Sequence, residues 1–324
     1  MSRTQDDYAP DLKNLSEPVL ANNTEPADPD TPDHSARRSV PLAPDSVKRD
    51  RMPDPFLTDN GRVLTVGEAG ETYLKIQRTN WKNDQLTSKY ERHLHKLYPR
   101  LLEADRHFQA EYDGLTTVML TRRLSPLDEF GGYLTPWECN EMLHGGGVHQ
   151  SLNQAISYQL GDSFRYEWVG VTSPTKTAGT PHEHLYFWIE DPADKITTQH
   201  FSTGLDKHIK YCTNAYEQDH TYRVDGTDGA LTFQHNPQRC ELSPDGFWNV
   251  REVSQTYAAT GQVRDNTTGA QYLASQLAHL PVADFYNSNH DYPPTALLEG
   301  AAMAWASPYN WFRASGGVPA LDAG

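Results

Sequence analysis

The chain has 324 residues, a length that suits one large domain or two small ones. Hydrophobic residues make up 37% of it, and no apolar run approaches the roughly 18–20 residues of a membrane-spanning helix, so we expect no membrane contact. Lys and Arg total 28 against 43 Asp and Glu, which gives a formal charge of −15. This balance argues against an ordinary nucleic-acid binder, which presents a basic surface to phosphates.

Two explanations would reconcile the acidic charge with nucleic-acid binding. Contacts to phosphates can be confined to a small local surface. Alternatively, the protein works in molar salt, where charges are screened within about 3 Å and many carboxylates keep a surface hydrated. The abundance of Asp and the scarcity of Lys fit the second explanation.

Residues 1–55 differ in composition from the rest of the chain. They contain nine of the 22 prolines and a single aromatic residue, Tyr8. Because such a segment buries too little apolar surface to offset the entropy of ordering, we predict a disordered acidic tail here. Residues 56–112 are expected to form a helical N-terminal extension, since from residue 72 onward apolar side chains recur every three or four positions.

Residues 113–285 alternate irregularly between strand-like and helix-like patterns, and we expect them to form the principal domain. Residues 115–124 predict a strand, and residues 144–161 predict a glycine loop followed by a helix. Residues 164–173 and 182–190 predict two strands joined by a turn rich in Pro, Gly and Thr, which is typical of an antiparallel hairpin.

The remainder of the chain adds helices and two further strand-like segments. Amphipathic spacing predicts helices at 196–216, 267–280 and 295–307, and apolar β-branched runs predict strands at 227–236 and 247–260. We expect residues 286–324 to form a C-terminal helical extension and tail. These elements together predict an α+β fold, in which helices pack on a central antiparallel sheet.

The sharpest local motif is His182-Glu183-His184 within the strand predicted at 182–190. Side chains of a strand alternate between its two faces, so His182 and His184 point the same way and can hold one cation with neutral imidazole nitrogens. Glu183 points to the other face, where a buried carboxylate needs a partner. We expect His144 and His149 to be surface or capping residues, and His200 and His208 to lie on the solvated face of one helix.

The order of three motifs resembles that of rolling-circle replication initiators of the HUH endonuclease superfamily. Those proteins have a short strand ending in Leu-Thr, then a His-x-His strand, then a helix with a nucleophilic tyrosine. The corresponding segments here are TVMLT at 117–121, HEH at 182–184 and GAQYLASQL at 269–277. The closer resemblance is to replication proteins of small haloarchaeal plasmids and pleomorphic haloviruses, which share the Tyr-Leu-Ala helix and an alanine-rich C-terminal segment.

The resemblance, which covers roughly residues 115–315, implies an HUH (Rep-like) fold with a ferredoxin- or RRM-like core and a role for each motif. Tyr272 would be the nucleophile that joins to a 5′ phosphate, and Tyr257 is the runner-up. His182 and His184 would hold a divalent cation, Mg²⁺ or Mn²⁺, with Glu167, Glu183 or Gln276 as third ligand or polar helper.

The same resemblance implies a partner and a location. The substrate would be single-stranded or origin DNA, and a host helicase and polymerase would extend the nicked strand. The location would be the cytoplasm of a halophilic archaeal host, which also explains the acidic charge.

Three alternatives to this hypothesis remain open. A non-catalytic origin-binding or structural relative would keep the fold and lack activity. An HUH transposase with one tyrosine shares the motif order, although such enzymes are usually shorter, and a relaxase would place its tyrosine before the histidine pair. A cupin-like metal protein would need further ligands and a glycine-rich barrel pattern, which the sequence lacks.

Overall fold

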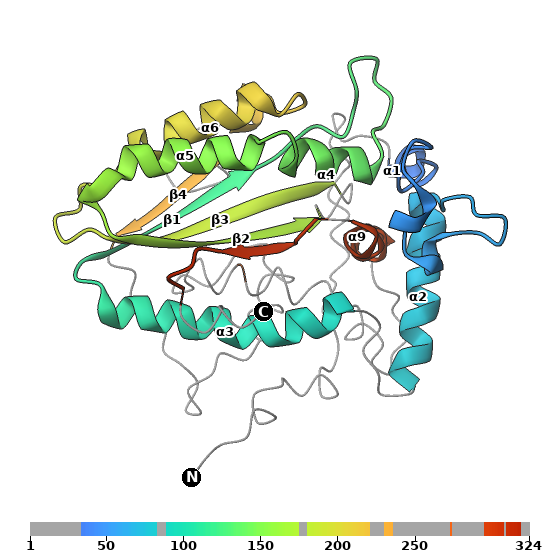
Figure 1. Cartoon of the computed structure of the whole chain (residues 1–324), viewed down its shortest axis with the longest axis horizontal. Coiled ribbons are helices and arrows are strands. Elements are labelled where there is room, and N and C mark those ends of the chain that lie inside the picture. The colour runs from blue at the N-terminus through green and yellow to red at the C-terminus, as the bar shows by residue number, and fades with distance from the viewer. Residues whose placement is uncertain are drawn as a thin grey trace, which may run out of the picture.

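The computed structural model describes residues 34–82, 89–174, 180–220, 230–235, 273, 295–307 and 309–318. These residues form an antiparallel sheet of five strands with helices packed on it (Figure 1), so the predicted α+β class is confirmed. The strand order is β4-β1-β3-β2-β5. The strands are β1 (Leu115–Arg122), β2 (Tyr166–Pro174), β3 (Pro181–Glu190), β4 (Leu231–His235) and β5 (Phe312–Ala314).

Strand β3 lies at the centre of the sheet, between β1 and β2. It pairs with β2 as the expected antiparallel hairpin, and its other edge pairs with β1 from Leu115 opposite Glu190 to Arg122 opposite Glu183. Alternation along β3 then divides the sheet into two faces. We call the first the histidine face, with His182, His184, Tyr186 and Trp188, and the second the opposite face, with Glu183, Leu185, Phe187 and Ile189.

Helices α5 (Val148–Leu160) and α6 (Gln199–Tyr211) cover the opposite face (Figure 1). They pack on Leu185, Phe187 and Ile189 through a cluster of buried aliphatic and aromatic side chains. A Cβ on Gly204 of α6 would lie 2.7 Å from Ile156 of α5, so glycine allows the two helices to approach closely. The short helix α4 (Pro136–His144) precedes α5 and begins with a capping box between Thr135 and Glu138. The 3₁₀ turn η5 (Gly161–Ser163) follows α5.

Helix α3 (Lys89–Glu111) lies on the other side of the sheet, over the histidine face (Figure 1). Leu101 and Phe108 of α3 belong to the same buried cluster as Tyr186 and Trp188 of β3. Asp105 of α3 is also buried, and its Oδ1 accepts a 2.7 Å hydrogen bond from the indole N–H of Trp188. The end of β3 away from the histidines is therefore filled by packed side chains.

A separate group of helices lies at one side of the sheet (Figure 1) and combines both ends of the described chain. It contains α1 (His34–Arg38), the 3₁₀ turns η3 (Arg49–Arg51) and η4 (Asp54–Phe56), α2 (Val66–Lys82) and α9 (Thr295–Ala306). Helix α2 packs along α9, where Gly70 lies against Glu299. No helix within these described ranges is long and apolar enough to cross a membrane.

The N-terminal segment differs from the predicted tail over residues 34–55. Leu42, Ala43 and Met52 are buried in one cluster with residues of α2 and α9, and Arg38 forms an ion pair with the buried Glu299 at 2.8 Å. The composition of residues 1–55 did not show this packing, because the surface that receives Leu42 and Met52 comes largely from distant parts of the chain. Residues 1–33 of the predicted tail lie outside the described residues.

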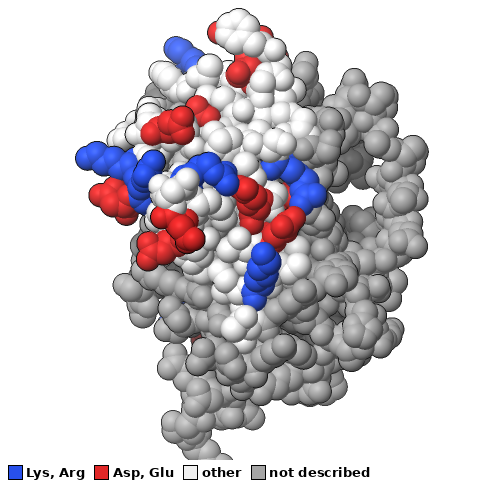
Figure 2. Space-filling model, turned by 90° about the vertical axis from the view of Figure 1, so that its right-hand side faces the viewer, with Lys and Arg blue, Asp and Glu red and all other residues white. Residues whose placement is uncertain are grey.

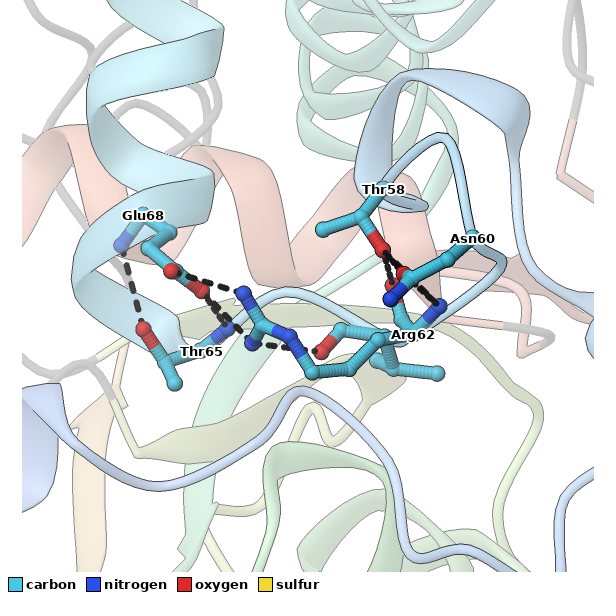
Figure 3. A network of polar contacts seen from close by, with 6 residues as sticks. Thr58, Asn60, Arg62, Thr65 and Glu68 are labelled. Atoms are coloured by element: carbon cyan, nitrogen blue, oxygen red, sulfur yellow. Dashed lines mark hydrogen bonds and ion pairs between the residues drawn. The ribbon is translucent and has the colours of Figure 1, made fainter.

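A polar network fixes the loop that leads into α2 (Figure 3). The backbone N–H groups of Thr65 and Glu68 bond to each other's side chains, which makes a capping box at the start of the helix. Arg62 donates two hydrogen bonds to the Glu68 carboxylate, at 3.0 and 2.9 Å, and these lower the pKa of Glu68 to about 2. Figure 2 shows this side of the molecule, where basic and acidic side chains lie next to one another on the described surface.

Candidate functional site

The two histidines of the motif meet on the histidine face of β3. Their Nε2 atoms lie 2.9 Å apart, and the rings stand nearly perpendicular to each other. The side chain of His184 is buried, and His182 is partly exposed. The structure thus places His182 and His184 together, as expected from alternation along a strand.

Both imidazoles are uncharged at neutral pH. Burial and, after it, the positive charge of Arg123 lower the pKa of His182 to about 4. The pKa of His184 also lies well below its usual value. Burial is the largest cause, followed by the charges of His182 and Arg123. A neutral imidazole has a free lone pair on one nitrogen, which is the form that binds a metal ion.

The predicted Leu-Thr strand lies beside the histidine strand. Thr121 of β1 pairs with His184 of β3, and its hydroxyl lies 2.9 Å from Nδ1 of that histidine. When Nδ1–H donates to Thr121, the lone pair of His184 is on Nε2 and faces His182. A hydrogen-bonding partner on the ring nitrogen that does not bind the metal sets the tautomer and the ring orientation of a histidine ligand. The two motifs, 61 residues apart from Thr121 to His182, therefore build one site.

The spacing of the two nitrogens fits a divalent cation. Two nitrogens bound to adjacent positions of an octahedral ion at about 2.1 Å lie about 3.0 Å apart, from the geometry of a right angle. The 2.9 Å between the Nε2 atoms of His182 and His184 is close to that separation. Within the residues that the structure describes, no group of three or more His, Cys, Asp or Glu side chains could hold a metal ion. The described residues therefore offer two candidate ligands, His182 and His184, without a third His, Cys, Asp or Glu side chain beside them.

Of the three residues predicted as a possible third ligand, Glu183 and Glu167 are described. Neither carboxylate lies next to the histidine pair. Glu183 points to the opposite face, where its carboxylate forms an ion pair with Arg122, and both side chains have an exposed fraction of 0%. Glu167 lies on the histidine face of β2, but it is opposite Trp188, which is four residues or about 13 Å along the strand from His184. Its carboxylate accepts a bond from the backbone N–H of Gly317 instead. The remaining candidate for this position, Gln276, lies outside the described residues.

The two candidate nucleophiles, Tyr272 and Tyr257, also lie outside the described residues. The residue that follows Tyr272, Leu273, is described: it is helical and fully buried. Leu273 belongs to the cluster on the histidine face, together with Val171 and Tyr186, which are near neighbours of the histidine pair in the sheet. Leu273, which directly follows Tyr272 in the sequence, is therefore packed on the same face as His182 and His184.

A polar cluster on the opposite face was missed by the sequence reasoning. It is organised around the ion pair of Arg122 and Glu183, next to which His149 lies with its Nδ1 3.7 Å from the Glu183 carboxylate. His144 accepts a 2.7 Å hydrogen bond from Arg313 of β5 and lies 3.1 Å from the hydroxyl of Thr172 of β2. Both partners of His144 therefore belong to elements other than its own helix α4.

The prediction of a solvated position was wrong for His208, while His144, His149 and His200 are partly exposed. Burial lowers the pKa of His144 to about 3. His208 of α6 is fully buried, and its Nε2 lies 3.0 Å from the backbone carbonyl of Arg123. The position of Glu183 between two histidines was one usable signal, because a carboxylate on a core-facing position demands a cation or donors nearby.

Comparison with known proteins gives one weak relationship. No family model matches the chain, and no solved structure matches it. Over 227 residues the chain is 23% identical to a protein of Halobacterium salinarum described as "Uncharacterized 36 kDa protein". The match covers 69% of this chain and 61% of that protein's length. Its description assigns no activity, so the case for function depends on the geometry of the site.

Proposed function

We propose that this protein is a rolling-circle replication initiator of the HUH type, which nicks and rejoins single-stranded origin DNA. The observation that carries the proposal is the histidine pair on the central strand of an antiparallel sheet, with its Nε2 atoms 2.9 Å apart and Thr121 of the neighbouring strand behind His184. The Leu-Thr strand and the His-x-His strand are adjacent, and Thr121 pairs with His184 in their register.

In the proposed reaction, the Tyr272 hydroxyl attacks the phosphorus of a phosphodiester. A bond forms between the phenolic oxygen and phosphorus, the bond from phosphorus to the 3′ oxygen breaks, and the phenolic proton ends on the released 3′ hydroxyl. The phosphotyrosine keeps the bond energy, so a 3′ hydroxyl can later reverse the step and rejoin the strand. A bound divalent cation would polarise the phosphate oxygens, and His182 and His184 are the side chains that would hold it.

The packing of Leu273 supports Tyr272 over Tyr257 as the nucleophile. Leu273 is buried on the histidine face, and Tyr272 is its immediate neighbour in the sequence. The nucleophile has to reach the phosphate that the histidine pair faces. A tyrosine directly before Leu273 in the sequence is suited to supply it.

The test is formation of a covalent DNA adduct. Overlapping single-stranded oligonucleotides that cover the replicon carrying the gene would be incubated with the full chain and Mn²⁺, then separated on a denaturing gel. Wild-type protein should form an adduct with the 5′ end of the cleaved strand, and Tyr272→Phe should form none, because it lacks only the attacking oxygen. Tyr257→Phe is the matched control and should behave like the wild type. An adduct with Tyr272→Phe but not with Tyr257→Phe would assign the other tyrosine.

A non-catalytic relative that binds origin DNA is the second candidate function. The observation that favours it is the lack of a third ligand among the described residues, with Glu183 bound to Arg122 on the opposite face. This candidate predicts oligonucleotide binding without any adduct, for the wild type as for Tyr272→Phe. An HUH transposase would form the same adduct, but on oligonucleotides from the ends of a mobile element.

The setting that fits the charge is the cytoplasm of a halophilic archaeon, where a host helicase and polymerase would extend the nicked strand. The net charge of −15 and the match to a Halobacterium protein support this part of the proposal. Carboxylate repulsion is screened as salt rises, so the melting temperature should increase toward molar KCl. A melting temperature that is unchanged or falls with KCl would contradict a halophilic origin.

A further inference from the structure

Arg123 occupies a particular place beside the histidine pair. It directly follows β1, whose last two residues divide between the faces: Thr121 bonds to His184 on the histidine face, and Arg122 bonds to Glu183 on the opposite face. Alternation returns Arg123 to the histidine face. Its side chain is exposed, so the guanidinium is available to a ligand that approaches the histidines.

Two buried histidines hold the backbone of Arg123. The amide N–H of Arg123 donates to Nε2 of His220 at 3.2 Å, and Nδ1 of His220 in turn donates to the Tyr216 carbonyl at 2.7 Å. The carbonyl of Arg123 accepts from Nε2 of His208 at 3.0 Å. The rings of His208 and His220 pack edge to face, with centroids 5.0 Å apart. Both polar backbone groups of an exposed arginine are thus fixed by side chains from α6 and the 3₁₀ turn η6 (Glu217–His220).

The charge of Arg123 is not neutralised by a neighbouring carboxylate within the part of the chain that the structure describes. Four described arginines have such partners, in the pairs Arg38–Glu299, Arg62–Glu68, Arg122–Glu183 and Arg165–Glu111, whereas Arg49, Arg51 and Arg313 resemble Arg123 in having no carboxylate ion pair among the described residues. Arg123 acts on the histidine pair instead, since its charge contributes to the lowered pKa of both imidazoles. In a chain with a net charge of −15, a free cation held at this point marks a local site for an anion.

We propose that Arg123 is a phosphate-binding residue of this site, which contacts the non-bridging oxygens of the phosphodiester that lies against His182 and His184. The inference rests on the proposed function and adds a residue to it. An arginine fork matches two phosphate oxygens at once, and its donors stay charged at any working pH. His208 and His220 act as positioning residues, because they fix the backbone from which the guanidinium extends.

The arrangement also answers how an acidic protein can bind a polyanion. A small number of cationic side chains near the reacting phosphate is sufficient to bind it, provided that these side chains are held in place and have no carboxylate partner. The rest of the surface can then carry carboxylates, which repel the phosphates of the DNA elsewhere. This is the first of the two explanations that composition allowed, local contact to phosphate.

The test measures single-stranded DNA binding separately from cleavage. A short mixed-sequence oligonucleotide with a fluorescent label would be titrated in EDTA by anisotropy, over a range of KCl concentrations. Arg123→Ala should weaken binding at low salt by about tenfold, the loss expected for one charge-assisted hydrogen bond, and reduce the slope of log affinity against log salt by about 0.7. Arg123→Lys should keep the slope, because it keeps the charge, but slow adduct formation in Mn²⁺, because the fork is lost.

Arg165→Ala is the matched control. Arg165 is also exposed, but it precedes β2, near Glu190 at the far end of the sheet from the histidines. An equal slope for Arg123→Ala and Arg165→Ala would overturn the assignment of Arg123, while a wild-type adduct would still support the proposed function. A specific slope effect of Arg123 without any adduct would keep the phosphate contact and overturn the nicking activity. If the wild type does not bind the oligonucleotide in EDTA, the assignment of Arg123 is overturned, and an adduct in Mn²⁺ would then still support the proposed function.

Discussion

Glu183 allows a direct test of how the strand between the two histidines is held. Its carboxylate and the Arg122 guanidinium form an ion pair in which neither side chain is exposed. Glu183→Gln keeps the shape of the side chain and removes the charge. Arg122 would then be left buried without its counter-charge, a situation that proteins tolerate poorly.

The expected loss follows from the burial of the pair. Removal of one partner of a buried ion pair costs about 3–5 kcal/mol, and we expect about 3 kcal/mol here because glutamine still accepts a hydrogen bond from Arg122. Replacement of both partners, Arg122→Met with Glu183→Leu, should restore much of the stability, since no charge is left in the core. The matched exposed pair is Arg62–Glu68, for which Glu68→Gln should cost about 1 kcal/mol or less.

Urea unfolding at neutral pH and one fixed salt concentration would measure these differences. The dependence of the unfolding free energy on urea should keep its slope, so that a lower midpoint reports lower stability. A cost below about 1 kcal/mol for Glu183→Gln, comparable to that of Glu68→Gln, would refute the argument from burial. A double variant no more stable than Glu183→Gln alone would show that the rest of the polar cluster depends on Arg122.

Three further predictions concern the metal site, a tight turn and pH. Thr121→Val removes the partner of His184 and should weaken Mn²⁺ binding about tenfold by calorimetry; unchanged affinity would remove its supporting role. Gly114→Ala should lower the free energy of unfolding, measured with urea, by about 2–3 kcal/mol. Gly114 has φ +62°, and a Cβ there would lie 2.3 Å from Pro192. An unfolding free energy equal to that of the wild type would contradict this close contact. The Glu68 contribution should be present above pH 4.5 and lost as pH falls toward 2, so a Glu68→Gln protein should show a weaker dependence of unfolding free energy on acid pH; parallel curves would contradict the lowered pKa of Glu68.

Local periodicity was sufficient to predict the parts of the structure that depend on one segment. The strand at 182–190 corresponds to β3, and alternation correctly placed His182 and His184 on one face and Glu183 on the other. The hairpin with 164–173 is present as β2 and β3, and the helix at 295–307 is present as α9. In each case the turn residues and the spacing of apolar side chains lie within a short stretch of sequence.

Features that join distant segments could not be predicted in this way. The central position of β3 depends on pairing with β1, about 65 residues earlier in the chain. Helical spacing predicted a solvated face for His208, but its imidazole is buried and lies 3.0 Å from the carbonyl of Arg123, which is 85 residues away in the sequence. The short strand β5 carries too few residues for a period-two pattern, and it exists because the edge of β2 has unpaired backbone groups.

The packing of α2 against α9 has a consequence for synthesis on the ribosome. The cluster that buries Leu42 and Tyr73 also needs Leu298 and Ala302, which are translated more than 220 residues after Tyr73. The N-terminal helices therefore emerge first but complete their core last, when the C-terminal helix leaves the exit tunnel. Until then their apolar faces stay exposed, so a truncated chain that lacks α9 would be a preferred target for proteases and chaperones.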